Sequence, residues 1–192
     1  EVGHEVGEPA RGSAHGRAVQ AGERTIVGLV GGEGLECAEI GRARGQHPVA
    51  GADEQLAQEV ERLSRDGVVE INLVAQDLTT YGTDLPFDVD HPDARPSLAN
   101  LLRRIGKPPK VGSSPDHLRW IRLHYTYPTA TTDELLQVMA ESPRVVRYID
   151  CPLQHIDDKL LKLMRRGYTG KSVYAMVERA KKHLPGLFLR TA

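Results

Sequence analysis

The sequence predicts an α/β fold in which helices alternate with parallel strands. Amphipathic helical patterns and short aliphatic runs alternate four times between residues 53 and 192. Each helix–strand unit takes roughly 25–45 residues, a length typical of crossovers between parallel strands, and polar residues gather directly after each aliphatic run. Since a closed barrel needs about eight such units, about four of them predict a partial (β/α) barrel.

Residues 1–52 differ from the rest of the chain and are predicted to form an irregular N-terminal segment. They contain no aromatic residue, and glycine, alanine, glutamate and arginine dominate them. Only residues 25–30, TIVGLV, have the composition of a strand. The glycines of residues 28–34 lack the spacing of a phosphate-binding loop, and no Lys-Ser or Lys-Thr pair follows them. We therefore take residues 53–192 as the incomplete barrel core.

The first unit begins with a predicted helix from Asp53 to Gly67. Aspartate is a common first residue of a helix and glycine a common last one. The aliphatic, β-branched run of residues 68–74 follows and predicts a parallel strand buried on both faces. Gln76 then starts a polar, turn-rich stretch, which ends that strand. The apolar positions that share one face of the helix are Leu56, Val60 and Leu63.

The other units repeat this pattern. Ser97 and Thr132 are each placed to cap a helix, and the proline-rich residues 107–116 predict a loop. Leu160, Leu161 and Met164 are expected to face inward from their helix. Helices are predicted at residues 97–106, 132–140, 157–166 and 171–184, and strands at residues 120–125, 145–149 and 187–191.

Polar residues that directly follow parallel strands share one rim of the sheet, where α/β enzymes place their chemistry. Taken singly, each has a structural explanation, such as a turn cap, a packing contact or the start of a helix. Their common position after successive strands favours a shared site. These residues are Gln76, Asp77, Tyr81, Tyr125, Tyr127, Thr129, Asp150, Cys151, Gln154, His155, Arg190 and Thr191.

Two other kinds of enzyme are less well supported. His124, His155, Asp77 and Asp150 are usable ligands for zinc or manganese. However, the sequence has no His-x-His or His-x-x-x-His pair, so a metallohydrolase is a minor alternative. A Gly-x-Ser-x-Gly motif for a serine nucleophile is also missing.

Charge and cysteine content narrow the setting. The formal net charge is −1 at pH 7, so no global charge attracts nucleic acid or an anionic membrane. Two cysteines, Cys37 and Cys151, do not make a disulfide framework, which predicts a reduced, cytoplasmic setting. No apolar run approaches the roughly 20 residues that cross a bilayer, so no membrane partner is expected.

Three stretches in order are specific enough to identify relatives. They are EINLVAQDLTTYGTDL at residues 70–85, WIRLHYTYP at residues 120–128 and RYIDCPLQHIDDKLLKLMRR at residues 147–166. Together they resemble the radical S-adenosylmethionine methylthiotransferases, most of all the branch that modifies an aspartate of a ribosomal protein. The tRNA-modifying branch, which acts on adenosine, is the alternative. The resemblance covers the chain from Asp53 onward.

This resemblance implies a partial (β/α) barrel that binds S-adenosylmethionine and a four-iron four-sulfur cluster. In the intact family, a methylthio group is added to the β-carbon of an aspartate in a small-subunit ribosomal protein, which would be the partner. Carried over by position, the cofactor-binding residues are Gln76, Asp77, Gln154 and His155, and the substrate rim includes Arg122 and Tyr125.

The sequence departs from the family at the cluster. The family's Cys-x-x-x-Cys-x-x-Cys motif aligns with Val30, Gly34 and Cys37, so Cys37 is the only remaining candidate ligand. One thiolate does not replace the three that hold such a cluster, and we interpret Cys151 as a core residue. We therefore expect a partial chain that binds no stable cluster and is inactive alone. A non-catalytic module that binds S-adenosylmethionine is the remaining alternative.

Overall fold

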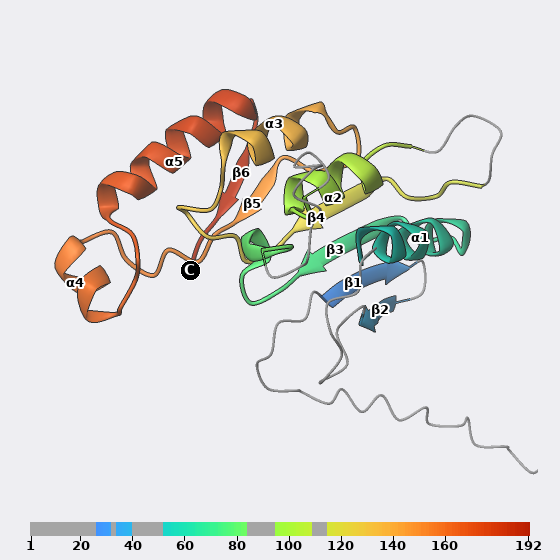
Figure 1. Ribbon diagram of the computed structural model, residues 1–192, viewed down its shortest axis with the longest axis horizontal. Helices are drawn as coiled ribbons and strands as arrows, with labels where there is room; N and C mark the ends of the chain where they lie inside the picture. The colour runs from blue at the N-terminus through green and yellow to red at the C-terminus, as the bar shows by residue number, and fades with distance from the viewer. Residues whose placement is uncertain (1–25, 32–33, 40–51, 84–94, 109–114) are drawn as a thin grey trace, which may run out of the picture.

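The computed structural model describes residues 26–31, 34–39, 52–83, 95–108 and 115–192, and the side chains from residue 53 onward. Helices and strands alternate along most of this part of the chain (Figure 1). The strands are β1 (Ile26–Gly31), β2 (Gly34–Glu39), β3 (Glu70–Val74), β4 (Trp120–Leu123), β5 (Tyr148–Asp150) and β6 (Phe188–Arg190). The helices are α1 (Ala52–Arg65), α2 (Leu98–Ile105), α3 (Asp133–Glu141), α4 (Asp158–Leu163) and α5 (Gly170–His183), with a 3-10 turn at Leu78–Thr80.

The strands of the four predicted units are parallel to their neighbours. β3 pairs with β4 in a register that sets Ile71 opposite Ile121, and β5 pairs with β6. A single parallel bridge between Ile121 and Val145 joins the two pairs. Helices lie between successive strands, as right-handed crossovers require. The predicted α/β class with parallel strands is therefore confirmed.

The segment before residue 52 contains two strands, of which only the first was expected from the sequence. β1 and β2 form an antiparallel hairpin, and β1 also lies antiparallel to β3, with Ile26 opposite Val74. The aliphatic β1 overlaps the predicted run TIVGLV, whereas the composition of β2, GLECAE, is poor for a strand. β2 forms because its backbone is hydrogen-bonded to β1, although its residues have a low propensity for strands. The other residues of 1–51 lie outside the described part of the chain.

Local capping signals set the helix ends. Ser97 Oγ accepts a hydrogen bond from the Asn100 backbone N–H at 3.1 Å, and Thr132 Oγ1 accepts one from Leu135 N–H at 3.2 Å. Both predicted caps are confirmed. Asp53, in contrast, lies inside the first turn of α1, where its carboxylate faces the positive end of the helix dipole.

The core lies between one face of the strands and the helices that follow one another across it (Figure 1). α1 packs on α2, α2 on α3 and α3 on α5. The predicted apolar face of α1 is buried, as Leu56, Val60 and Leu63 show. The strands contribute five fully buried side chains, namely Ile71, Leu73, Ile121, Leu123 and Ile149.

The inward face predicted for α4 is largely wrong. Only Leu161 is buried, where it packs with Tyr168 and Val173, whereas Leu160 is 41% exposed and Met164 46% exposed. The helix ends at Leu163 and lies beside the start of α5 at one end of the molecule (Figure 1). It is too short and too distant to cover the sheet with a full apolar face.

The strand at residues 68–74 is not buried on both faces, which corrects another expectation. Ile71 and Leu73 are buried, but Glu70 and Asn72, which alternate with them, are only partly buried. β4 alternates in the same way, because Ile121 and Leu123 are buried and Arg122 is partly exposed. Successive side chains of a strand point to opposite faces, so the two strands present one apolar face and one polar face.

None of the described helices is long and apolar enough to cross a membrane.

Candidate functional site on the polar face

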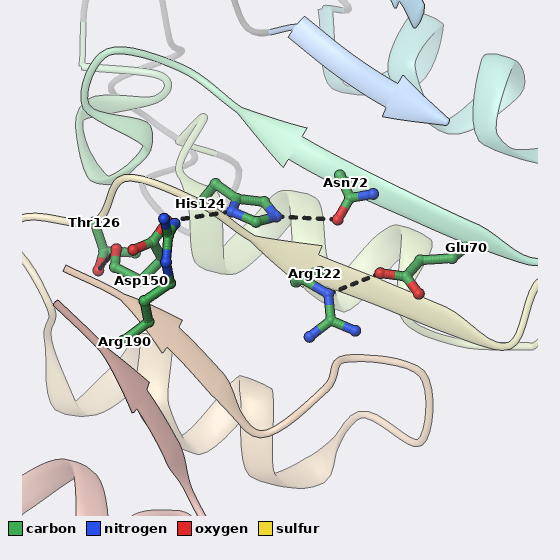
Figure 2. Close-up of polar contacts among 7 residues, drawn as sticks. All are labelled: Glu70, Asn72, Arg122, His124, Thr126, Asp150 and Arg190. Carbon is green, nitrogen blue, oxygen red and sulfur yellow. Dashed lines mark hydrogen bonds and ion pairs between the residues drawn. The ribbon is translucent and has the colours of Figure 1, made fainter. Parts of the chain in front are cut away.

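A group of polar side chains lies on one face of the four parallel strands, away from the apolar core (Figure 2). We call it the polar face. β3 and β4 contribute through their alternating positions, and His124 directly follows β4 on the same side. The polar face consists of Glu70, Asn72, Arg122, His124, Tyr148, Asp150 and Arg190.

Asp150 is the centre of the first group of contacts. Its side chain is 3% exposed, and Oδ2 lies 3.0 Å from Arg190 Nη1 and 3.2 Å from His124 Nδ1. The backbone carbonyl of Asp150 accepts hydrogen bonds from Thr126 N–H at 2.8 Å and Thr126 Oγ1 at 3.0 Å. These contacts fix both the carboxylate and its backbone, so Asp150 is a rigid anchor for the groups around it.

His124 extends this group across the sheet. Its Nε2 lies 3.0 Å from Asn72 Oδ1, while Nδ1 faces the Asp150 carboxylate (Figure 2). A ring with a proton on both nitrogens donates to both oxygens, and a neutral ring satisfies both contacts when the Asn72 amide is turned to donate. Contacts between the side chains of Asn72, His124, Asp150 and Arg190 therefore link β3, β4, β5 and β6.

A second group lies alongside the first. Arg122 Nε donates to Glu70 Oε1 at 2.7 Å, and the Arg122 guanidinium lies 4.9 Å from the centroid of the Tyr148 ring. The charge of Asp150, with the Tyr148 hydroxyl as a nearby acceptor, raises the pKa of Arg190. Tyr148 therefore has one arginine over its ring and the other near its hydroxyl, and it joins the two groups.

The rim residues predicted from the sequence lie on loops that adjoin one another. Leu78 N–H donates to the Tyr125 carbonyl at 3.0 Å, and Gln154 N–H donates to the Ala192 carbonyl at 2.8 Å. With the bond from Thr126 to Asp150, these contacts run along the carboxyl ends of all four parallel strands. The structure thus brings the predicted segments together at one edge of the sheet.

The predicted side chains on these loops mostly have local roles. Asp77 Oδ1 accepts from Thr79 N–H at 3.0 Å and so caps the 3-10 turn, and His155 Nδ1 accepts from Asp157 N–H at 2.9 Å. Gln76 and Gln154 are exposed, as is Tyr125. No recorded contact among the described residues joins these side chains to one another. Arg122 lies on the strand itself, within the polar face.

Tyr125 and Gln154 also have unusual backbones. Their φ angles are 58° and 65°, in the left-handed region that favours glycine. Such conformations cost on the order of 1–3 kcal/mol and often occur at functional sites. Both residues follow strands at the rim, so the strain coincides with the edge that the sequence singled out.

Sequence reasoning missed the polar face as a unit. Asp150 was expected as a rim residue or a metal ligand, Arg190 only as a rim residue, His124 only as a metal ligand, and Asn72 was not considered. The signal was present in the alternation Glu-Ile-Asn-Leu at residues 70–73 and Trp-Ile-Arg-Leu-His at residues 120–124. Alternation in two neighbouring parallel strands predicts a polar side opposite the helices.

The metal-binding alternative is not supported by the structure. Within the described residues, no group of three or more histidine, cysteine, aspartate or glutamate side chains is placed to hold a metal ion. Cys151 is fully buried after β5, and burial raises the pKa of its thiol to about 11. Cys37 lies in β2 opposite Gly28 of β1, and its side chain lies outside the described part.

Comparison with known proteins places the chain in a family. The model of the Radical SAM superfamily matches residues 37–191. A protein of Myxococcus xanthus named ribosomal protein uS12 methylthiotransferase RimO is 40% identical over 139 residues, 72% of this chain and 26% of the relative. Proteins of the same name from Desulfotalea psychrophila and Symbiobacterium thermophilum are 42% identical over 136 residues and 36% identical over 166 residues.

These matches cover 71% and 83% of this chain, and 28% and 30% of those two relatives. The chain thus spans less than a third of the length of these curated relatives. The family model nevertheless covers most of the chain, including all four parallel strands and the polar face. The chain belongs to the radical SAM superfamily.

Proposed function

We propose that this chain is the S-adenosylmethionine-binding portion of a ribosomal protein methylthiotransferase. The activity is the addition of a methylthio group to the β-carbon of an aspartate in the small-subunit protein uS12. The observation that carries the proposal is 36–42% identity to three relatives with that name. These names favour the ribosomal branch over the tRNA-modifying one. A ribosomal substrate agrees with the cytoplasmic setting expected from the sequence.

The strand arrangement supports a partial (β/α) barrel for this portion. The order β3–β4, followed through the Ile121–Val145 bridge by β5–β6, is that of successive parallel units. Helices pack against one face of these strands. The opposite, polar face would then line the interior, where the cofactor and the substrate meet.

The rim residues are proposed to bind the cofactor. Gln76 and Asp77 would accept from the ammonium at its methionine end, and Gln154 and His155 would lie beside its ribose or the substrate. Adjoining loops support this assignment, because backbone hydrogen bonds join the segments that carry these residues. Tyr125 would complete the substrate rim, together with Arg122 on the polar face.

The cysteines of this chain do not fit the four-iron four-sulfur cluster that the superfamily uses. Three thiolates are required, and the sequence holds only Cys37 and Cys151. The buried Cys151 keeps its proton at neutral pH because burial raises the pKa of the thiol to about 11. Cys37 would remain as a lone ligand. This mismatch favours a second candidate function, a cofactor-binding module without catalytic turnover.

Titration calorimetry of the purified chain with S-adenosylmethionine tests the proposed function. We expect saturable binding at one site, which Asp77→Ala weakens and the distant surface change Arg179→Gln leaves unchanged. Absence of binding by the folded chain would contradict the proposal.

Anaerobic reconstitution with iron and sulfide tests the mismatch at the cluster. The chain as it stands should show no stoichiometric, cysteine-dependent absorbance from thiolate–iron charge transfer. The double variant Val30→Cys and Gly34→Cys, which restores the family spacing to Cys37, should gain it. A cluster in the unchanged chain would show that the mismatch is not decisive.

A further inference from the structure

The most exposed charged groups of the polar face are two guanidinium groups, which are hydrogen-bond donors. The Arg190 side chain is 60% exposed, whereas its partner Asp150 is 3% exposed. The Arg122 side chain is 30% exposed, and its partner Glu70 is 16% exposed. In each pair the arginine side chain is thus more exposed than the carboxylate. Although the two acids balance the two arginines in number, the accessible surface is cationic.

Both arginines retain donors for a ligand. Arg122 uses Nε for Glu70, and no hydrogen bond from its two terminal nitrogens to another described residue is recorded. Arg190 uses Nη1 for Asp150. Arg122 also lies over the Tyr148 ring, and Arg190 is held by the buried Asp150 carboxylate. The donors are therefore held in place before a ligand arrives, which lowers the entropy cost of binding.

We propose that Arg190, assisted by Arg122, binds the side-chain carboxylate of the target aspartate and so selects aspartate over asparagine. The inference rests on the proposed function. The planar guanidinium matches a carboxylate through two parallel hydrogen bonds. Holding the carboxylate fixes the adjacent β-carbon, which is the atom to be modified.

Asp150 and His124 are positioning residues in this arrangement. Asp150 Oδ2 holds Arg190 Nη1 at 3.0 Å and is itself braced by His124 Nδ1 at 3.2 Å. Asn72 in turn holds the other nitrogen of the ring at 3.0 Å. The chain of contacts restricts the direction in which Arg190 presents its remaining N–H groups. S-adenosylmethionine also carries a carboxylate, so a test must separate the cofactor from the protein substrate.

The test measures binding of two synthetic peptides to the full chain saturated with S-adenosylmethionine. One peptide spans the target aspartate of uS12, and the other carries asparagine in its place. We expect the unchanged chain to prefer the aspartate peptide. Arg190→Gln should weaken binding of the aspartate peptide about ten- to a hundredfold and so remove the preference for it over the asparagine peptide. The affinity for S-adenosylmethionine should stay unchanged. Arg190→Lys should retain part of the preference.

Controls separate a binding role from a structural one. Arg179→Gln removes another exposed guanidinium, which pairs with Asp133 at 3.0 Å on the helix side, and should change neither peptide's affinity. Asp150→Asn alone should weaken binding of the aspartate peptide. The same substitution should have no further effect when it is combined with Arg190→Gln. Circular dichroism melting verifies that the variants remain folded.

Several results would overturn the inference. The first is a preference for aspartate that survives Arg190→Gln. The second is a loss of S-adenosylmethionine affinity without a change for the peptides, which would assign Arg190 to the cofactor. Failure of the unchanged chain to bind the aspartate peptide while it binds S-adenosylmethionine would overturn only this inference. Failure to bind S-adenosylmethionine would remove the proposed function as well.

Discussion

Two aspartate–arginine pairs in this molecule have the same chemistry and opposite exposure. In the pair Asp116–Arg144, the arginine side chain is 8% exposed, whereas in the pair Asp150–Arg190 it is 60% exposed. The first pair precedes β4 and β5, and the second lies at the carboxyl ends of β5 and β6. The comparison shows that pairing alone does not define the role of an arginine. The exposure of its remaining donors does.

The covered pair closes a structural network. Asp116 Oδ1 accepts from Ser64 Oγ at 2.8 Å, and that hydroxyl accepts from the His117 and Leu118 N–H groups at 3.2 Å each. Arg144 Nη1 also donates to the Lys107 carbonyl at 3.3 Å. These contacts tie the end of α1 to the segments that lead into β4 and β5. The open pair has no comparable cover over its arginine.

Removal of the covered arginine should have the largest effect on stability. Arg144→Met leaves the partly buried carboxylate of Asp116 without its cation, so we expect a loss of about 2–3 kcal/mol in the free energy of unfolding. Urea denaturation measures it. The double variant Arg144→Met and Asp116→Leu should recover part of the loss, because no unpaired charge remains. A change below about 0.5 kcal/mol would place Arg144 with the surface arginines.

The thiol next to the open pair should make stability depend on pH. Burial raises the pKa of Cys151 from its ordinary 9.0 to about 11. The folded state thus favours the neutral thiol, and its contribution is complete below pH 9 and lost as the pH rises from about 9 to 11. The loss should reach at most about 2–3 kcal/mol. Between pH 8 and 11, the free energy of unfolding of the unchanged chain should fall more steeply with pH than that of Cys151→Ala. The same pH dependence in both proteins would contradict the expectation.

The buried acid of the open pair should have an intermediate effect. Asp150→Asn keeps the shape and one acceptor but removes the charge that Arg190 and His124 face. We expect a loss of about 1 kcal/mol in the free energy of unfolding, measured by urea denaturation at pH 7. A stabilised variant would indicate that burial of the carboxylate costs more than its partners return.

The exposed arginine of the open pair should have the smallest effect. Arg190→Gln should alter the free energy of unfolding by no more than about 0.5 kcal/mol, because surface ion pairs contribute little. Thermal melting, with Arg179→Gln as the matched surface control, measures it. A loss as large as that of Arg144→Met would show that the two pairs have the same structural role.

Local signals in the sequence predicted much of the fold. Ser97 and Thr132 specify helix starts through hydrogen bonds within three residues, and Leu56, Val60 and Leu63 specify a buried face by spacing alone. These features depend on neighbours along the chain, which a single sequence displays. The parallel order followed from the alternation of helices and strands.

The features that the sequence did not predict depend on partners far along the chain. β2 exists because β1 pairs with it, despite a glycine- and acid-rich composition. The contact between His124 and Asp150 requires the register between β4 and β5, which no local pattern encodes. The exposure of Leu160 and Met164 depends on how far α4 lies from the sheet. The rim loops were found because they follow strands, and the polar face was missed because the strand at residues 68–74 was expected to be buried on both faces.

The most direct test of the contrast between the two pairs is a nuclear magnetic resonance titration of the arginine Nε–H signals with the aspartate peptide, in the presence of S-adenosylmethionine. We predict that the signals of Arg190 and Arg122 shift saturably while that of Arg144 does not move. Unchanged signals from Arg190 and Arg122 at saturating peptide, or a shift confined to Arg144, would contradict it.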